Sequence, residues 1–154
     1  MNILITAGLG LKSIKLGKLL KLHSVTLADF GDLSTINVSN ITFKSLGEKN
    51  EDSLAHQLLT ACLDVNADVL IPLYKDEIES CKVAIPLFEE FGIQVVIASE
   101  INIDVKELSV LVDQETLILS KGNELISGKF LESKMECSGI YVKNSEGTQF
   151  KAFI

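Results

Sequence analysis

Short apolar segments alternate with amphipathic helical segments through the first hundred residues of this chain. Residues 2–6, 24–28, 67–72 and 93–98 are apolar and strand-like, and a shorter strand is expected around residues 41–43. Residues 11–22, 51–64 and 76–91 repeat apolar side chains at the spacing of a helix. The run from Ala67 to Pro72 is apolar except at Asp68, as in a strand covered on both faces. Strands separated by helices predict right-handed βαβ units and a parallel sheet.

The pattern changes after residue 103. Short strand-like segments separated by turn clusters occupy residues 108–112, 116–120, 124–130, 139–143 and 149–153. We therefore expect an α/β fold, with a Rossmann-like parallel sheet flanked by helices over residues 1–103. Residues 104–154 are expected to form a C-terminal antiparallel β-hairpin extension, arranged as a meander. Because no Pro-, Gly- or Ser-rich linker separates the two parts, we expect them to pack as one unit.

All fourteen cationic side chains are lysine, and the formal net charge at pH 7 is −7. Arginine is the residue that grips phosphates and carboxylates with two hydrogen bonds and reads guanine edges. An acidic chain without arginine is therefore a poor candidate for nucleic-acid binding. The same composition weighs against autonomous phosphoryl or carboxyl transfer, in which arginine commonly neutralises developing charge.

The sequence predicts a cytoplasmic protein without a membrane partner. Its apolar runs are too short to span a bilayer, and the first residues lack the basic region and longer apolar stretch of a signal peptide. The three cysteines form no CxxC pair, which argues against a zinc or redox site and favours a reducing compartment. We interpret Cys62 and Cys81 as core thiols on helices and Cys137 as a half-buried strand residue.

Candidate binding residues follow from the rule that open parallel sheets bind ligands beyond the carboxyl ends of their strands. The first turn contains Gly8 and Gly10, with Ser13 where a GxGxxG motif has its third glycine. The amides that begin the helix can receive an anion there; the alternative is a tight strand-to-helix turn. Asp29 ends the second strand, where dinucleotide-binding domains place an acid for the ribose hydroxyls. The alternative for Asp29 is a solvated carboxylate that caps a loop.

The segment after residues 67–72 supplies the remaining candidates for ligand binding. These are Pro72, Lys75, Asp76 and Glu77. The two acids open a helix, where negative charge suits the helix macrodipole.

Neither histidine has an evident catalytic partner in the local sequence. His23 is expected to finish the first helix, and His56 to face solvent or the boundary of the core on the second. We therefore predict no catalytic residue, no metal site and no cofactor in this chain.

Residues 2–100 resemble the N-terminal lobe of the ATP-grasp superfamily, the pre-ATP-grasp domain of carbamoyl phosphate synthetase large subunits, biotin carboxylases and related carboxylate–amine ligases. The resemblance covers about two thirds of the chain. The segments that carry it are Ile3-Leu-Ile-Thr-Ala-Gly-Leu-Gly, Leu27-Ala-Asp29, Ala67-Asp-Val-Leu-Ile-Pro72 followed by Asp76-Glu77, and Phe91-Gly-Ile-Gln-Val-Val.

The resemblance implies that the Pro-x-x-Asp-Glu type segment of this family, here Pro72-Leu-Tyr-Lys-Asp76-Glu77, lies at a substrate cleft. One extra residue separates the proline from the acids in this chain, so either Lys75 or Asp76 takes the family position. The resemblance also implies ATP-binding lobes after residue 99, with a lysine, a glycine-rich phosphate loop and acidic metal ligands. Residues 101–154 contain no matching motif. The chain therefore carries no complete active site, and as part of an enzyme it would belong to an ATP-dependent carboxylate–amine ligase.

Two hypotheses of different classes remain open. In the first, the chain is a stand-alone, non-catalytic pre-ATP-grasp-like module that binds a small molecule or an ATP-grasp partner protein. In the second, it is a small NAD(P)- or nucleotide-binding Rossmann-like protein that contributes to an enzyme as an oligomer. Both include self-association, because the C-terminal strands end on apolar Phe150, Phe153 and Ile154, and an exposed sheet edge favours pairing.

Overall fold

The computed structural model describes residues 1–32, 37–38, 40–97, 116–119, 125–127, 139–143 and 150–152. The chain divides into two compact units, Met1–Val95 and Val96–Ile154. That the C-terminal strands pack with the first hundred residues as one unit stays a prediction.

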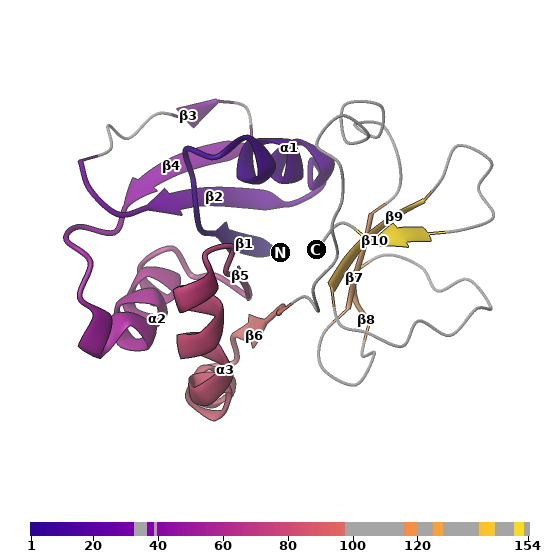
Figure 1. Ribbon diagram of the computed structural model, residues 1–154. Helices are drawn as coiled ribbons and strands as arrows, with labels where there is room; N and C mark the ends of the chain where they lie inside the picture. Colours follow the sequence, from indigo (N-terminus) through magenta and orange to yellow (C-terminus); the bar gives the residue numbers. More distant parts are fainter. Residues whose placement is uncertain are drawn as a thin grey trace. The chain divides into compact units, whose positions relative to one another are not determined.

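The first unit is built on a six-stranded sheet (Figure 1). Its strands are β1 (Asn2–Ile5), β2 (Ser24–Asp29), β3 (Asn37–Val38), β4 (Ile41–Ser45), β5 (Val69–Ile71) and β6 (Gln94–Val95). Their spatial order is β3-β4-β2-β1-β5-β6, and all neighbours pair parallel except β3, which pairs antiparallel with β4 at the edge. The predicted α/β fold with a parallel sheet flanked by helices is confirmed.

Helices cover both faces of this sheet. They are α1 (Leu11–Leu19), the short 3-10 helix η1 (Glu51–Ser53), α2 (Leu54–Asp64) and α3 (Lys75–Glu90). Two residues of β4 contact the helices: Ile41 faces Gly17 of α1, and Lys44 forms an ion pair with Asp64 of α2 at 3.1 Å. Successive residues of β4 point to opposite faces, so α1 and α2 lie on opposite sides of the sheet. α2 contacts α3, and the two lie together in Figure 1.

The predicted bounds of the first helix are wrong at its end. α1 stops at Leu19, and the amide of His23 donates to the carbonyl of Leu20 at 2.8 Å in the following turn. His23 therefore lies beyond the helix that it was expected to finish. Leu11 and Leu22, the apolar residues at the two ends of the predicted helical segment, are 69% and 88% exposed. Gly92, two residues after the end of α3, has a φ of +72°, the left-handed conformation in which glycine commonly ends a helix.

The core of the first unit lies between the sheet and its helices. The following apolar side chains are fully buried: Ile3, Leu4, Ile5, Leu16, Leu20, Leu27, Leu58, Leu70, Ile71 and Phe88. Cys62 and Cys81 are buried between them, and burial raises the pKa of both thiols to about 12. Their interpretation as core thiols is confirmed; Cys137 lies outside the described residues. In the described part of the chain, no helix has the length and apolar character needed to cross a bilayer.

The described strands of the second unit form a four-stranded antiparallel sheet. They are β7 (Thr116–Leu119), β8 (Leu125–Ser127), β9 (Gly139–Lys143) and β10 (Phe150–Ala152), in the order β10-β9-β7-β8. The order differs from the expected meander because β9 pairs with β7 and not with β8. The strand predicted at residues 108–112 and the last two residues lie outside the described part, and self-association through these strands stays a prediction.

Candidate functional site

Three of the loops that follow parallel strands meet at one edge of the sheet. The amide of Thr6, at the end of β1, donates to Ile71 of β5 at 3.1 Å, and the amide of Gly8 donates to Ala28 of β2 at 2.9 Å. The chain passes from β1 to β2 on one side and later returns to β5 on the other side. The gap between β1 and β5 is therefore a topological switch point, where open α/β sheets bind ligands. We call this edge the carboxyl rim; it comprises residues 6–10, 29–32, 45–50 and 72–77.

Gly8 makes a close approach of main chain to main chain. A Cβ on Gly8 would lie 3.0 Å from the carbonyl carbon of Leu27 and 3.1 Å from the backbone nitrogen of Ala28. The hydroxyl of buried Ser13 donates to the carbonyl of Gly10 at 2.7 Å and also to that of Ala7. The glycines and Ser13 thus build a tight strand-to-helix turn, and the binding of an anion there stays a prediction. What remains for an anion is the start of α1, which has no side-chain cap and no acid in its first turn.

Asp29 ties together the loops after β1, β2 and β5. Its carboxylate accepts the amide of Phe30 at 2.9 Å on one oxygen, and the amide of Leu9 and the hydroxyl of Tyr74 at 3.4 Å each on the other. Asp29 thus caps its loop, as in the alternative interpretation, but at 8% exposure it is buried and not solvated. Because protein donors already contact both oxygens, Asp29 holds the carboxyl rim in shape.

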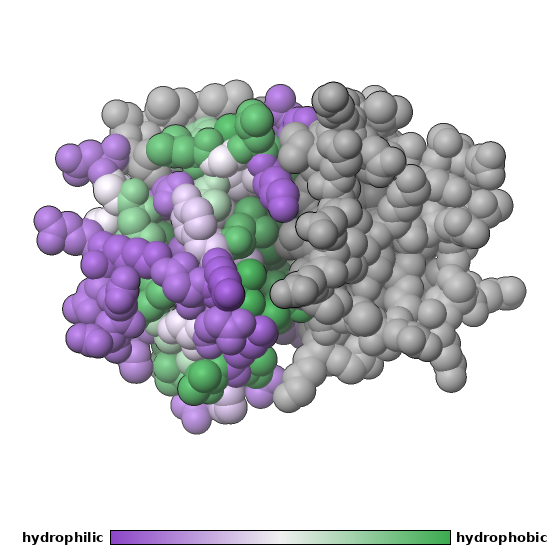
Figure 2. Space-filling model, in the orientation of Figure 1, coloured by the Kyte–Doolittle hydropathy of each residue, from purple (hydrophilic) through white to green (hydrophobic). Residues whose placement is uncertain are grey.

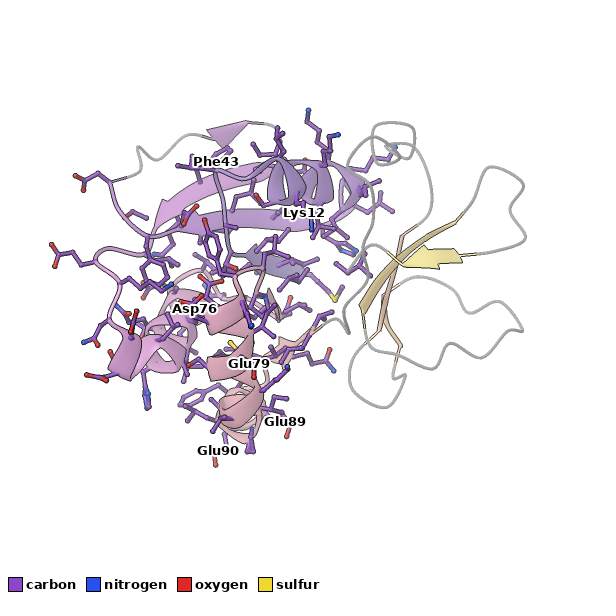
Figure 3. All side chains as sticks on the ribbon, viewed as in Figure 1. Lys12, Phe43, Asp76, Glu79, Glu89 and Glu90 are labelled. Carbon is purple, nitrogen blue, oxygen red and sulfur yellow. The ribbon has the colours of Figure 1, made fainter. Side chains whose placement is uncertain are left out.

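The segment after β5 places its candidates in different environments. Pro72 is buried directly after the strand, and the hydroxyl oxygen of Thr6 accepts the amide of the next residue, Leu73, at 2.7 Å. Lys75 is exposed as the first residue of α3, and Asp76 beside it is also exposed. Hydrophilic side chains gather on the surface over α2 and the start of α3 (Figure 2). Figure 3 shows Asp76 at this start of α3, far along the helix from Glu89 and Glu90, which lie exposed at the other end.

Glu77 is fully buried beneath the carboxyl rim. One carboxyl oxygen accepts the amide of Tyr74 at 3.3 Å, which is half of a capping box. The other oxygen, Oε1, has no hydrogen-bond partner among the residues that the structure describes. Burial raises the pKa of Glu77, and the nearby Thr6 hydroxyl and Tyr74 amide oppose this rise. A buried polar atom without a partner costs about 1–3 kcal/mol, and Oε1 is free to accept a hydrogen bond from a ligand.

Glu77→Gln is expected to change how stability depends on pH. The pKa of Glu77 is higher in the folded chain than its ordinary value of 4.5, so the folded state keeps the proton to higher pH than the unfolded state does. The stability that Glu77 contributes is therefore fully present below the unfolded pKa and is lost as pH rises through the folded pKa. The loss is about 1.4 kcal/mol for each unit by which the two pKa values differ. Glutamine resembles the protonated acid and removes this dependence.

Urea unfolding of the wild type and of Glu77→Gln at about pH 5 and about pH 8 measures the effect. The variant should gain stability relative to the wild type at the higher pH. Glu89→Gln removes an exposed carboxylate from the same helix and serves as the matched control. An equal difference between Glu77→Gln and the wild type at both pH values would contradict the expectation.

A cation site on the carboxyl rim was not predicted from the sequence. The ammonium of Lys49 lies 5.6 Å from the ring centroid of Phe30 and 5.7 Å from that of Tyr74, and it forms an ion pair with Asp76. Its hydrogen bond with Asp76 raises the pKa of Lys49 and lowers that of Asp76. The one feature of the sequence that could have indicated this cluster is position, because Phe30 and Lys49 follow the ends of β2 and β4.

An open groove of about 360 Å³ lies between the end of β4 and α2. It is lined by Lys44, Ser45, Leu46, His56, Gln57, Thr60, Ala61 and Asp64. His56 is exposed there, as predicted, and its carbonyl accepts the hydroxyl of Thr60 at 2.8 Å. Lys44 and Asp64, the two charged residues of the groove, form an ion pair with each other. The groove therefore offers no unpaired charge to a ligand.

No protein-family model, curated protein or solved structure matches the chain. Within the described ranges, no three histidine, cysteine, aspartate or glutamate side chains lie close enough to hold a metal ion. Function must therefore be inferred from the geometry of the carboxyl rim.

Proposed function

We propose that the chain is a non-catalytic, pre-ATP-grasp-like module that binds a small molecule at its carboxyl rim and works with an ATP-grasp partner protein. The observation that carries the proposal is Glu77, a fully buried carboxyl group at the switch point with one unpartnered oxygen. Perturbed, incompletely bonded acids in such a position are typical of functional sites. The sequence resemblance of residues 2–100 to pre-ATP-grasp domains supports the same class of protein.

Binding fits the described residues better than catalysis does. The thiols of Cys62 and Cys81 are buried and have pKa values of about 12, so they are not thiolates at neutral pH. His56 lies on α2, and His23 precedes β2 at the amino ends of the strands. His23 is therefore not placed to act on a ligand at the carboxyl rim, whereas His56 lines the open groove that includes Ser45 and Leu46 of the rim.

The geometry gives less support to the nucleotide-binding alternative. A ribose would need the carboxylate of Asp29, whose two oxygens already accept from Leu9, Phe30 and Tyr74. The uncapped start of α1 is the feature that favours this alternative, because its amides are oriented for an anion.

A ligand screen on the full chain separates the two. We expect no thermal shift with NAD(H), NADP(H) or ATP–magnesium, and amide chemical-shift changes at residues 6–10 and 72–77 with a member of a library of non-nucleotide amines and carboxylates. Glu77→Gln should weaken that binding, whereas Glu89→Gln should leave it unchanged. A shift of several degrees with one of the nucleotides would establish the alternative, and a library without any binder at these residues would refute the proposal.

A further inference from the structure

The side chains around Lys49 form a receptor for an ammonium group. Two aromatic rings, Phe30 and Tyr74, lie within 6 Å of Nζ, the range over which a ring face attracts a cation. Asp76 supplies the counter-charge. Rings and a carboxylate gathered on one cation are the chemistry by which proteins recognise alkylammonium ligands.

The walls of this receptor are fixed by the fold. Phe30 directly follows β2, and its amide is held by Asp29 at 2.9 Å. The hydroxyl of Tyr74 donates to the same Asp29, and its amide donates to Glu77, so the residue is held at both ends. Asp76 lies in the first turn of α3. None of these contacts involves Lys49, so the receptor can keep its shape without that lysine.

The occupant, in contrast, is a long side chain on a connecting loop. Lys49 lies between β4 and η1, and its side chain is 32% exposed. Lysine side chains have four rotatable carbon–carbon bonds, and an exposed ion pair contributes only about 0–1 kcal/mol. The ammonium can therefore leave the rings and enter solvent by side-chain rotation alone.

We propose that Phe30, Tyr74 and Asp76 bind the alkylammonium group of a small molecule, and that Lys49 occupies this receptor as an internal competitor. The inference names the ligand class for the carboxyl rim and rests on the function proposed above. A competitor that fills the receptor most of the time lowers the apparent affinity of the external ligand by the fraction of time that the receptor is open.

Tetramethylammonium is the probe, titrated into the full chain at constant ionic strength and followed by the ring resonances of Phe30 and Tyr74. Lys49→Ala should bind it at least about fivefold more tightly than the wild type does. Lys44→Ala is the matched control, because Lys44 also forms an ion pair, with Asp64, and is 29% exposed, but it has a different environment. This control should bind as the wild type does.

Two double variants test the rings. Lys49→Ala with Tyr74→Phe keeps the ring and should retain binding, whereas Lys49→Ala with Tyr74→Leu should lose it. Equal binding by Lys49→Ala and the wild type, or by the two double variants, would overturn the inference. If Lys49→Ala does not fold, the Lys49 Cε resonance of the wild type replaces it as the readout: it must shift saturably as the probe displaces the ammonium, and a constant resonance overturns the inference.

Further ligands distinguish a small molecule from a modified peptide as the source of the ammonium group, and failure of this inference from failure of the proposed function. Choline should bind Lys49→Ala more tightly than a trimethyllysine peptide does; the opposite order would overturn the assignment to a small molecule. If no ammonium compound binds but another library member perturbs residues 6–10 and 72–77, this inference fails and the proposed function stands. If neither binds, both fail.

Discussion

Phe88→Ala is expected to lower the free energy of unfolding by about 3–5 kcal/mol. The Phe88 side chain is fully buried on α3, in a stripe with Cys81 and Glu77. Truncation removes most of the apolar surface of the ring from the core and leaves a cavity, because neighbouring side chains collapse only in part. Urea denaturation followed by far-UV circular dichroism measures the loss as a lower midpoint.

Val83→Ala is the matched control for Phe88→Ala. Val83 lies on the same helix, two turns before the end, and is 86% exposed. Removing its methyl groups should change stability by no more than about 0.5 kcal/mol. A loss for Phe88→Ala that is as small as this would mean that α3 does not pack on the sheet as the structure shows.

The parallel sheet was predictable because its parallel strands are short apolar segments separated by helical segments. The run from Val69 to Pro72 is apolar on both faces, which is typical of a strand with helices on either side. β3 was missed because two residues at a sheet edge bury too little surface to impose a pattern. Leu22 was placed in the first helix because helical periodicity counts apolar residues without knowing where the helix stops, and α1 ends at Leu19.

The candidate site was predictable in position but not in chemistry. Parallel strands put their carboxyl ends at one edge, so the loops with Gly8, Asp29 and Glu77 had to meet there. The burial of Asp29 and Glu77 depends on how neighbouring loops cover them, which no local pattern encodes. The receptor around Lys49 could not be predicted from local patterns either. Its residues follow the ends of separate strands and come together only after the sheet has formed.

Gly8→Ala is expected to destabilise the fold by about 1–3 kcal/mol. The new methyl group would lie 3.0 Å from the carbonyl carbon of Leu27 and 3.1 Å from backbone atoms of Ala28. Backbone atoms of a central strand cannot rotate away, so the turn after β1 must move and strain the hydrogen bond from Gly8 to Ala28. Thermal or urea unfolding measures the loss.

Gly17→Ala separates this steric effect from the general effect of replacing a glycine. Its Cβ would meet the end of the Ile41 side chain at 3.2 Å, and that methyl group can turn aside. Alanine also favours the helix by about 1 kcal/mol, so this variant should lie within about 1 kcal/mol of the wild type. If Gly8→Ala were as stable as Gly17→Ala, the main chains of the first turn and β2 would not touch. The turn after β1 would then be free to shape itself around an anion, as in the nucleotide-binding alternative.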